Sequence, residues 1–188
     1  MRTRVLNPLK LDVAALAADA GSLDGVWPAA SLERLADLAA ADKPLASWPD
    51  LRWSCQAEIR KPRAAEPQVW MQVQAQGAAF LTCQRCLKAV KVPLNLSAWF
   101  RFARDEATAA DIDAESEEDV LVLARHMDLR ELIEDELLLA LPIVPRHDEC
   151  PEPLPMSHGD EEVVEDDAEN RPTPFAALAA LKGTGCKQ

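Results

Sequence analysis

This chain of 188 residues lacks the sequence features that mark many enzymes and membrane proteins. It contains only six glycines, none in a phosphate-binding loop, and no serine lies in a Gly-x-Ser-x-Gly setting. No run of roughly 18 apolar residues is present, as a membrane-spanning helix would require. The first residues also lack the apolar segment of a secretory signal. We therefore expect a cytoplasmic, non-enzymatic protein with no membrane contact, and no small-molecule substrate can be identified.

Cysteine is also scarce, and its five copies form an odd set that argues against a disulfide framework. Cys83 and Cys86 form a Cys-x-x-Cys turn between two expected strands, the position from which zinc ribbons draw two thiolates. Tetrahedral zinc needs four ligands, and His147 and Cys150 could supply the other two. The sequence thus predicts a candidate zinc site of Cys83, Cys86, His147 and Cys150.

Two other interpretations of the Cys-x-x-Cys turn remain open. It could be a tight structural turn, or a redox dithiol in a thiol-disulfide redox protein. Redox cysteines of the thioredoxin type begin a helix, whose N-terminus lowers the thiol pKa. Here alternating β sequence follows instead, although Arg85 and Lys88 would favour a thiolate. A structural zinc-binding adaptor is a further alternative.

Charge is distributed very unevenly behind the net value of −12. Residues 105–119 contain eight acids and residues 148–169 contain ten, with no Lys or Arg in either stretch. Residues 51–104 have nine bases against two acids. A basic module flanked by acidic segments could bind a polyanion, or its acidic segments could bind basic proteins. The simpler alternative is a solvated surface with solubilising loops.

The hydrophobic pattern predicts an α+β fold with an antiparallel β-sheet core covered by helices. Residues 1–46 are Ala/Leu-rich and expected to be helical, with a helix opened by Pro28. Clean alternation predicts strands over 51–60, 68–82 and 89–103, with a bulge or bend at Gly77 and an edge position or bulge at Pro93. We expect one domain over 1–146, with the sheet and its Cys-x-x-Cys turn in 51–103.

The remaining chain is expected to pack against this sheet. Residues 104–118 are predicted to be an acidic flexible loop, and 120–123 a returning strand. Asp128 should cap a helix with Leu129, Leu132, Ile133, Leu137 and Ala140 buried, and with its carboxylates, including Glu134, on a solvated face. The apolar run 137–144 indicates a buried helix end.

The predicted outer face of the sheet carries cations beside Trp70 and Trp99. Such a face could bind a nucleic acid by stacking and phosphate contacts, unless helices from the N-terminal region cover the two indoles. The candidate RNA-binding residues are Arg52, Arg60, Lys61, Arg85, Lys88, Lys91 and Arg101.

Residues 147–188 are predicted to be an acidic, largely disordered tail that ends in a short amphipathic helix. Phe175, Leu178 and Leu181 lie on the apolar side of that helix. They are candidate partner-docking residues, for a groove of this protein or of a partner.

Several of these motifs occur in an order that resembles a known family. They are the Cys83–Cys86 turn, the run from Glu134 to Pro145, His147 with Cys150, and the closing segment from Pro174 to Leu178. The chain resembles the YceD family, the large ribosomal RNA subunit accumulation proteins of bacteria and plastids. The resemblance implies a role in 23S ribosomal RNA synthesis, processing or stability and in large-subunit assembly. It implies ribosomal RNA or basic large-subunit ribosomal proteins as partners, and the dense acids favour the latter.

Overall fold

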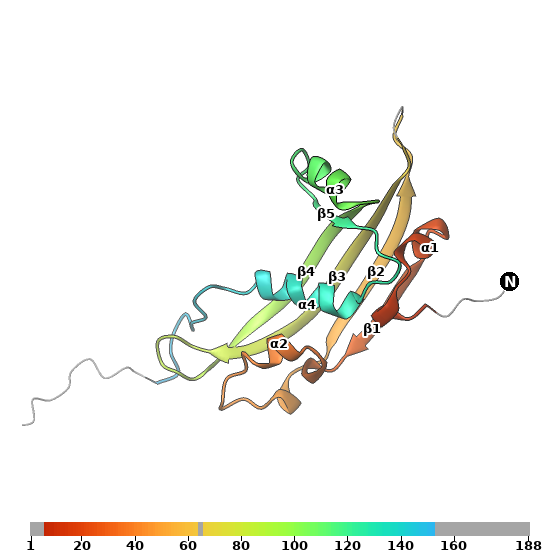
Figure 1. Ribbon diagram of the computed structural model, residues 1–188. Coiled ribbons are helices and arrows are strands. Elements are labelled where there is room, and N and C mark those ends of the chain that lie inside the picture. Colours follow the sequence, from red (N-terminus) through yellow and green to blue (C-terminus); the bar gives the residue numbers. More distant parts are fainter. Residues whose placement is uncertain (1–5, 64–65, 153–188) are drawn as a thin grey trace, which may run out of the picture. The chain divides into compact units, whose positions relative to one another are not determined.

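The computed structural model describes residues 6–63 and 66–152. They form a five-stranded sheet in the order β1-β2-β3-β4-β5, packed with helices, so the predicted α+β class is confirmed (Figure 1). Neighbouring strands are antiparallel except β4 and β5, which are parallel. The strands are β1 Ser22–Trp27, β2 Leu51–Arg60, β3 Gln68–Thr82, β4 Ala89–Ala103 and β5 Asp119–Val122.

The three central strands have the bounds that the sequence predicts. Alternation of apolar and polar residues gives each of them one mainly apolar face, and the strand register places those faces on the same side of the sheet. We call this side the inner face. Its buried residues include Trp53 and Cys55 on β2, Met71 and Val73 on β3, and Phe100 on β4.

Three helices lie over the inner face (Figure 1). Their bounds are α1 Val13–Ala18, α2 Glu33–Ala36 and α4 Leu129–Leu139. Short 3-10 turns occur at Pro8–Lys10, Ala29–Ser31 and Leu45–Ser47. Leu16, Leu35 and Ile133 from the three helices join the same core as the inner strand residues. The outer face therefore carries the polar half of each strand's alternation.

The prediction of a helical N-terminal region is partly wrong, because residues 22–27 form the edge strand β1. The Val26-Trp27 pair favours a strand, and Gly25 disfavours a helix. Gly25 is also required by packing: a Cβ there would lie 2.7 Å from Cζ2 of Trp53, which stacks on Trp27. In the helix expected after Pro28, Leu32 and Leu35 are buried, but Leu38 is exposed.

The sequence predicts a bulge or bend at Gly77 and an edge position or bulge at Pro93, and the structure bears out only the edge position. The predicted bulge at Gly77 is absent, since β3 pairs with β4 in unbroken register through this position. A Cβ at Gly77 would instead lie 3.0 Å from Leu51, so the glycine makes room for core packing. The edge position predicted for Pro93 is confirmed, because β5 pairs only with residues 100–103 of β4. Among the described strands, none pairs with the other edge of β4 at Pro93, so the missing N–H of proline leaves no ladder hydrogen bond unmade.

The predicted flexible loop at 104–118 is wrong, because it contains α3, Glu106–Asp113. The side chain of Asp105 accepts a hydrogen bond from the backbone N–H of Thr108 and so caps the helix. Alanines supply the helix propensity of a segment that has little apolar periodicity. The strand predicted over 120–123 is present as β5, shifted by one residue, and it runs parallel to β4.

Helix α4 begins as predicted, with Asp128 accepting hydrogen bonds from the backbone N–H groups of Arg130 and Glu131. Three expectations for its surface are wrong. Glu134 is buried, with 7 % of its surface exposed, whereas Ala140 is exposed. The apolar run 137–144 is not a buried helix end, since Leu139 is 81 % exposed and Ile143 is fully exposed.

Among residues 6–63 and 66–152, no helix is long and apolar enough to cross a membrane. The predicted acidic tail beyond residue 152 lies outside the described residues, as do its candidate docking residues Phe175, Leu178 and Leu181.

Candidate metal centre and nucleic-acid interface

The structure brings together all four predicted metal ligands. Cys83 and Cys86 lie in the turn between β3 and β4, and His147 and Cys150 lie in the segment after α4. The three sulfur atoms and one nitrogen of the imidazole all lie within 4.8 Å of one another. Cys83 is fully buried, and the other three residues are partly buried. This Cys3His cluster could hold a metal ion.

The hairpin backbone fixes the two cysteines of the turn. The N–H of Cys83 donates to the carbonyl of Lys88, and the N–H of Leu87 donates to the carbonyl of Cys83, both over 2.9 Å. Closing this tight turn places Leu87 at φ 59°, in the left-handed region that disfavours residues with a Cβ. The turn is therefore held in a strained form that presents both thiols to the same side.

His147 is oriented by its second ring nitrogen. Nε2 lies 3.0 Å from the carbonyl oxygen of Ala89, which can only accept, so Nε2 carries the proton. Nδ1 is then the unprotonated nitrogen, and it lies 3.4 Å from Sγ of Cys86. An imidazole held through one nitrogen with the other facing the ligand cluster is the usual arrangement of a metal-binding histidine.

Arg85 ties the segment of residues 147–150 to the hairpin. Its Nε donates to Sγ of Cys150 over 3.0 Å, and a terminal nitrogen donates to the carbonyls of His147 and Asp148. The bond to Cys150 is the main reason that the pKa of Arg85 is raised. The backbone N–H of Gln84 adds a bond of 2.9 Å to the carbonyl of Pro145. Hydrogen bonds from Arg85 and Gln84 thus attach residues 145–150 to the turn.

The hydrogen bonds at the cluster favour a thiolate at Cys83. Burial by itself would raise its pKa, but the backbone N–H groups of Cys86, Arg85 and His147 lower it to about 5. At Cys86 the backbone N–H of Lys88 lowers the pKa, yet burial and the neighbouring sulfurs outweigh it, so the net shift is upward. Neighbouring thiols that oppose each other's ionisation are a favourable setting for a cation.

The strain at Leu87 leads to a testable prediction. We expect Leu87→Gly to stabilise the protein by about 1 kcal/mol, because glycine adopts positive φ without a steric penalty. Leu87 is 72 % exposed, so little packing is lost. Leu87→Val, with its β-branched side chain, should destabilise the protein instead. Urea unfolding of both variants measures the difference, and equal stabilities would contradict the strained turn.

The predicted RNA-binding residues fall into separate groups. Arg52, Arg60, Lys91 and Arg101 lie on the outer face, as their register on β2 and β4 requires. Lys61 follows β2 at the far end of the sheet. Arg85 and Lys88 lie in the metal-binding turn, and Arg85 is committed to that cluster. The structure therefore does not gather the seven residues into one patch.

The indoles of Trp70 and Trp99 pack against each other on the outer face. Their rings make an edge contact with centroids 6.5 Å apart, and the Arg60 guanidinium lies 4.3 Å and 4.4 Å from the two centroids. Trp70 is buried by these neighbours, while Trp99 stays partly exposed. The alternative that N-terminal helices cover both indoles is wrong, because α1 and α2 pack on the inner face.

The middle of the outer face is polar and open. It presents amide side chains on three strands, with Arg52 and Lys91 exposed nearby. Near the β3–β4 turn it is partly covered, since Trp48 packs on Phe80 with ring centroids 6.0 Å apart. The exposed amides are Gln56, Gln74, Gln76 and Asn95, and the partly buried Gln72 accepts a hydrogen bond from Gln56.

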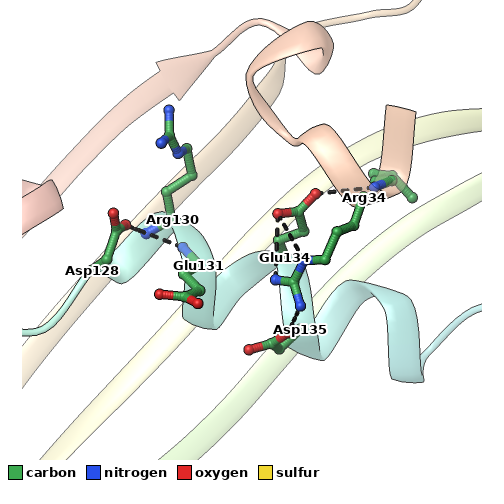
Figure 2. Close-up of polar contacts among 7 residues, drawn as sticks. Arg34, Asp128, Arg130, Glu131, Glu134 and Asp135 are labelled. Atoms are coloured by element: carbon green, nitrogen blue, oxygen red, sulfur yellow. Dashed lines mark hydrogen bonds and ion pairs between the residues drawn. The ribbon is translucent and has the colours of Figure 1, made fainter. Parts of the chain in front are cut away.

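An ion-pair cluster between α2 and α4 was missed by the sequence interpretation (Figure 2). The carboxylate of Glu134 accepts a hydrogen bond of 3.0 Å from the backbone N–H of Leu35 and pairs with Arg34 over 3.4 Å. Arg34 also pairs with Asp135, the main cause of its raised pKa. A helical wheel gives the missed signal: Glu134 precedes Leu137 by three residues, beside the buried stripe.

The family model described as the large ribosomal RNA subunit accumulation protein YceD matches residues 71–182. The match begins within β3 and includes all four residues of the Cys3His cluster. No solved structure matches the chain.

Proposed function

The chain belongs to the YceD family of large ribosomal RNA subunit accumulation proteins, and from this premise we propose that it supports accumulation of 23S ribosomal RNA and large-subunit assembly by binding RNA rather than by catalysis. The observation that carries the proposal is the open outer face of the sheet. Its exposed side chains are mainly amides, hydroxyls and cations, with Val26 as an exposed apolar residue and Asp24 and Glu58 as the acids of its strands. Glu58 is already paired with Arg60 over 2.6 Å.

RNA binding suits this face chemically. Guanidinium and ammonium groups can contact phosphates, and amide side chains can bond base edges of single-stranded RNA. The partly exposed Trp99 offers one ring for base stacking. Arg60, held between the two indoles, fixes that ring in place. Arg101 contributes less, because it shares a surface pocket with Asp111 and Glu115 of the α3 region.

We further propose that the Cys3His cluster binds structural zinc. Cysteine and histidine are the ligands of structural zinc sites, and this cluster supplies a complete set of four. Bound zinc would cross-link the hairpin to residues 147–150. Three thiolates and one dication leave a single negative charge, and the guanidinium of Arg85 lies against Cys150 to compensate it.

A binding experiment tests the RNA contact. The full chain is titrated with a single-stranded fragment of large-subunit ribosomal RNA at several salt concentrations. We expect the double variant Arg52→Ala, Lys91→Ala to bind more weakly and to reduce the slope of log K against log salt by about 1.4, since each single-strand phosphate contact contributes about 0.7. Both side chains are exposed, so folding should be unaffected.

A matched control removes the same kind of charge from the other side of the protein. Lys10 is exposed on the 3-10 turn that packs near α4, away from the outer face. Lys10→Ala should leave the salt slope unchanged. RNA affinity and slope that are the same in wild type and double variant would refute the sheet-face contact. Recovery of basic ribosomal proteins after nuclease treatment, without RNA, would favour a protein partner instead.

A further inference from the structure

Large apolar side chains are exposed on the surface at the C-terminal end of α4. Leu139 is 81 % exposed, Ile143 is fully exposed, and Leu38 is 47 % exposed. They line a groove of about 590 Å³. Clustered exposed apolar side chains on a protein surface usually mark an interaction site. The main apolar residues of the groove are Leu38, Leu81, Leu138, Leu139, Leu141 and Ile143.

The walls of this groove are held by backbone contacts. Ala39, next to Leu38, forms a β-bridge with Leu81 at the end of β3. Gln84 and Pro145, which also line the groove, are joined by a hydrogen bond of 2.9 Å. Segments from three parts of the chain therefore form the groove without a partner. Because the groove is already formed, binding would cost little conformational entropy of the protein.

Acidic side chains lie beside the groove, outside its lining. Asp37 is exposed and directly precedes Leu38 at the end of α2. On α4, Glu131 and Asp135 precede Leu139 by eight and four residues, so all three lie along one face of the helix. Arg34 pairs with Glu134 and Asp135, so the acids that it leaves unpaired beside the groove are Asp37 and Glu131 (Figure 2). The cation Arg130 lies next to Glu131 at the start of α4. Arg146 is exposed and directly follows the lining residue Pro145.

We propose that this groove binds a Lys/Arg-rich amphipathic helical segment of a partner protein. The apolar side of such a helix would fill the groove, and its cations would meet Asp37 and Glu131 beside it. The proposal goes beyond RNA binding and does not depend on it, because α2 and α4 lie on the inner side of the sheet, opposite the proposed RNA contact. An RNA ligand would gain nothing from the apolar side chains and would be repelled by the acids.

The test measures anisotropy of two fluorescent peptides titrated with the full chain. Both are amphipathic helices about five turns long with the same leucine stripe; the remaining positions are Lys and Arg in one peptide and Glu in the other. We expect the basic peptide to bind at least about tenfold more tightly than the acidic one. Leu139→Asp with Ile143→Asp should weaken its binding by about tenfold or more. Both side chains are exposed, so the variant should fold.

Three controls identify the site. Val26→Asp places the same change at an exposed apolar residue of β1, away from the groove, and should leave peptide affinity unchanged. Asp37→Asn with Glu131→Gln should reduce the preference for the basic peptide. RNA affinity should be the same in the groove variant as in wild type, so failure of one proposal can be distinguished from failure of the other.

Several results would overturn the groove proposal. Equal binding of the basic and acidic peptides would remove the charge argument. Unchanged binding in the Leu139→Asp, Ile143→Asp variant would place the peptide elsewhere. Sedimentation gives the third: a wild-type dimer that becomes a monomer in this variant would show that a second copy of the chain covers the groove.

Discussion

Replacing Cys83 with serine is expected to reduce the zinc content of the purified protein from one ion per chain to none. The substitution changes one atom and keeps the buried volume, so the fold should survive it. Cys83 is the ligand most ready to bind, because its pKa of about 5 makes it a thiolate at neutral pH. Metal analysis of protein purified without chelator, with zinc supplied during growth, measures the effect.

Loss of the metal should also lower thermal stability. A ligand present at a thousand times its Kd stabilises the folded state by about 4 kcal/mol. In a chain of this size that corresponds to a decrease in Tm of about 10 °C on chelation. Cys83→Ser should melt near the chelated wild type and should not respond to chelator.

The control for this experiment is Cys55→Ala. Cys55 is a buried core cysteine on β2, and burial raises the pKa of its thiol to about 11. Its removal should leave one zinc ion per chain and an unchanged response to chelator. Wild-type protein without bound metal, combined with rapid reaction of Cys83 and Cys86 with an alkylating reagent, would contradict the zinc site and favour the thiol-disulfide redox alternative.

Replacing Glu134 with alanine is expected to destabilise the protein by about 2–3 kcal/mol. The carboxylate accepts from the buried backbone N–H of Leu35, and a buried donor left without a partner is costly. The same change removes one of the two ion pairs by which Arg34 joins α2 to α4. Glu134→Gln keeps an acceptor for Leu35 and should cost about 1 kcal/mol. Urea unfolding of the two variants gives these values.

Glu131→Ala is the matched control, because Glu131 lies on the same helix but is exposed. Its effect should stay within about 0.5 kcal/mol. If alanine at positions 131 and 134 has the same small effect, the buried carboxylate does not join the two helices. The distinction matters for the groove, since the Arg34 cluster holds the end of α2 that carries Leu38 beside α4.

The sequence predicted the elements whose pattern is set locally. Strands β2 and β4 alternate along their length and β3 alternates over residues 68–76, and the bounds of all three strands are confirmed. The start of α4 is confirmed because one side chain, Asp128, caps it. Strand β1 was missed because Asp24 and Gly25 interrupt a short pattern. Helix α3 was missed because its stability comes from alanines and a cap rather than from an apolar stripe.

The candidate site was predictable to the extent that it depends on residue type and spacing. Residue type and local spacing identify the four ligands, and the structure brings the two pairs together across more than sixty residues of sequence. The exposure of Leu139 and Ile143 could not be predicted, because apolar character alone indicates burial. The same limit applies to Glu134, whose partner Arg34 lies one hundred residues away. Both depend on how α2 and α4 meet.

The proposed RNA contact by the outer face is tested most directly in cells that lack their own copy of this protein. The quantity to measure there is the ratio of large-subunit to small-subunit ribosomal RNA. Wild type should restore the ratio. The Arg52→Ala, Lys91→Ala variant, produced at the same level, should fail to restore it, whereas Lys10→Ala should succeed. Full restoration of the ratio by the double variant would contradict the claim that the outer face of the sheet supports accumulation of the RNA.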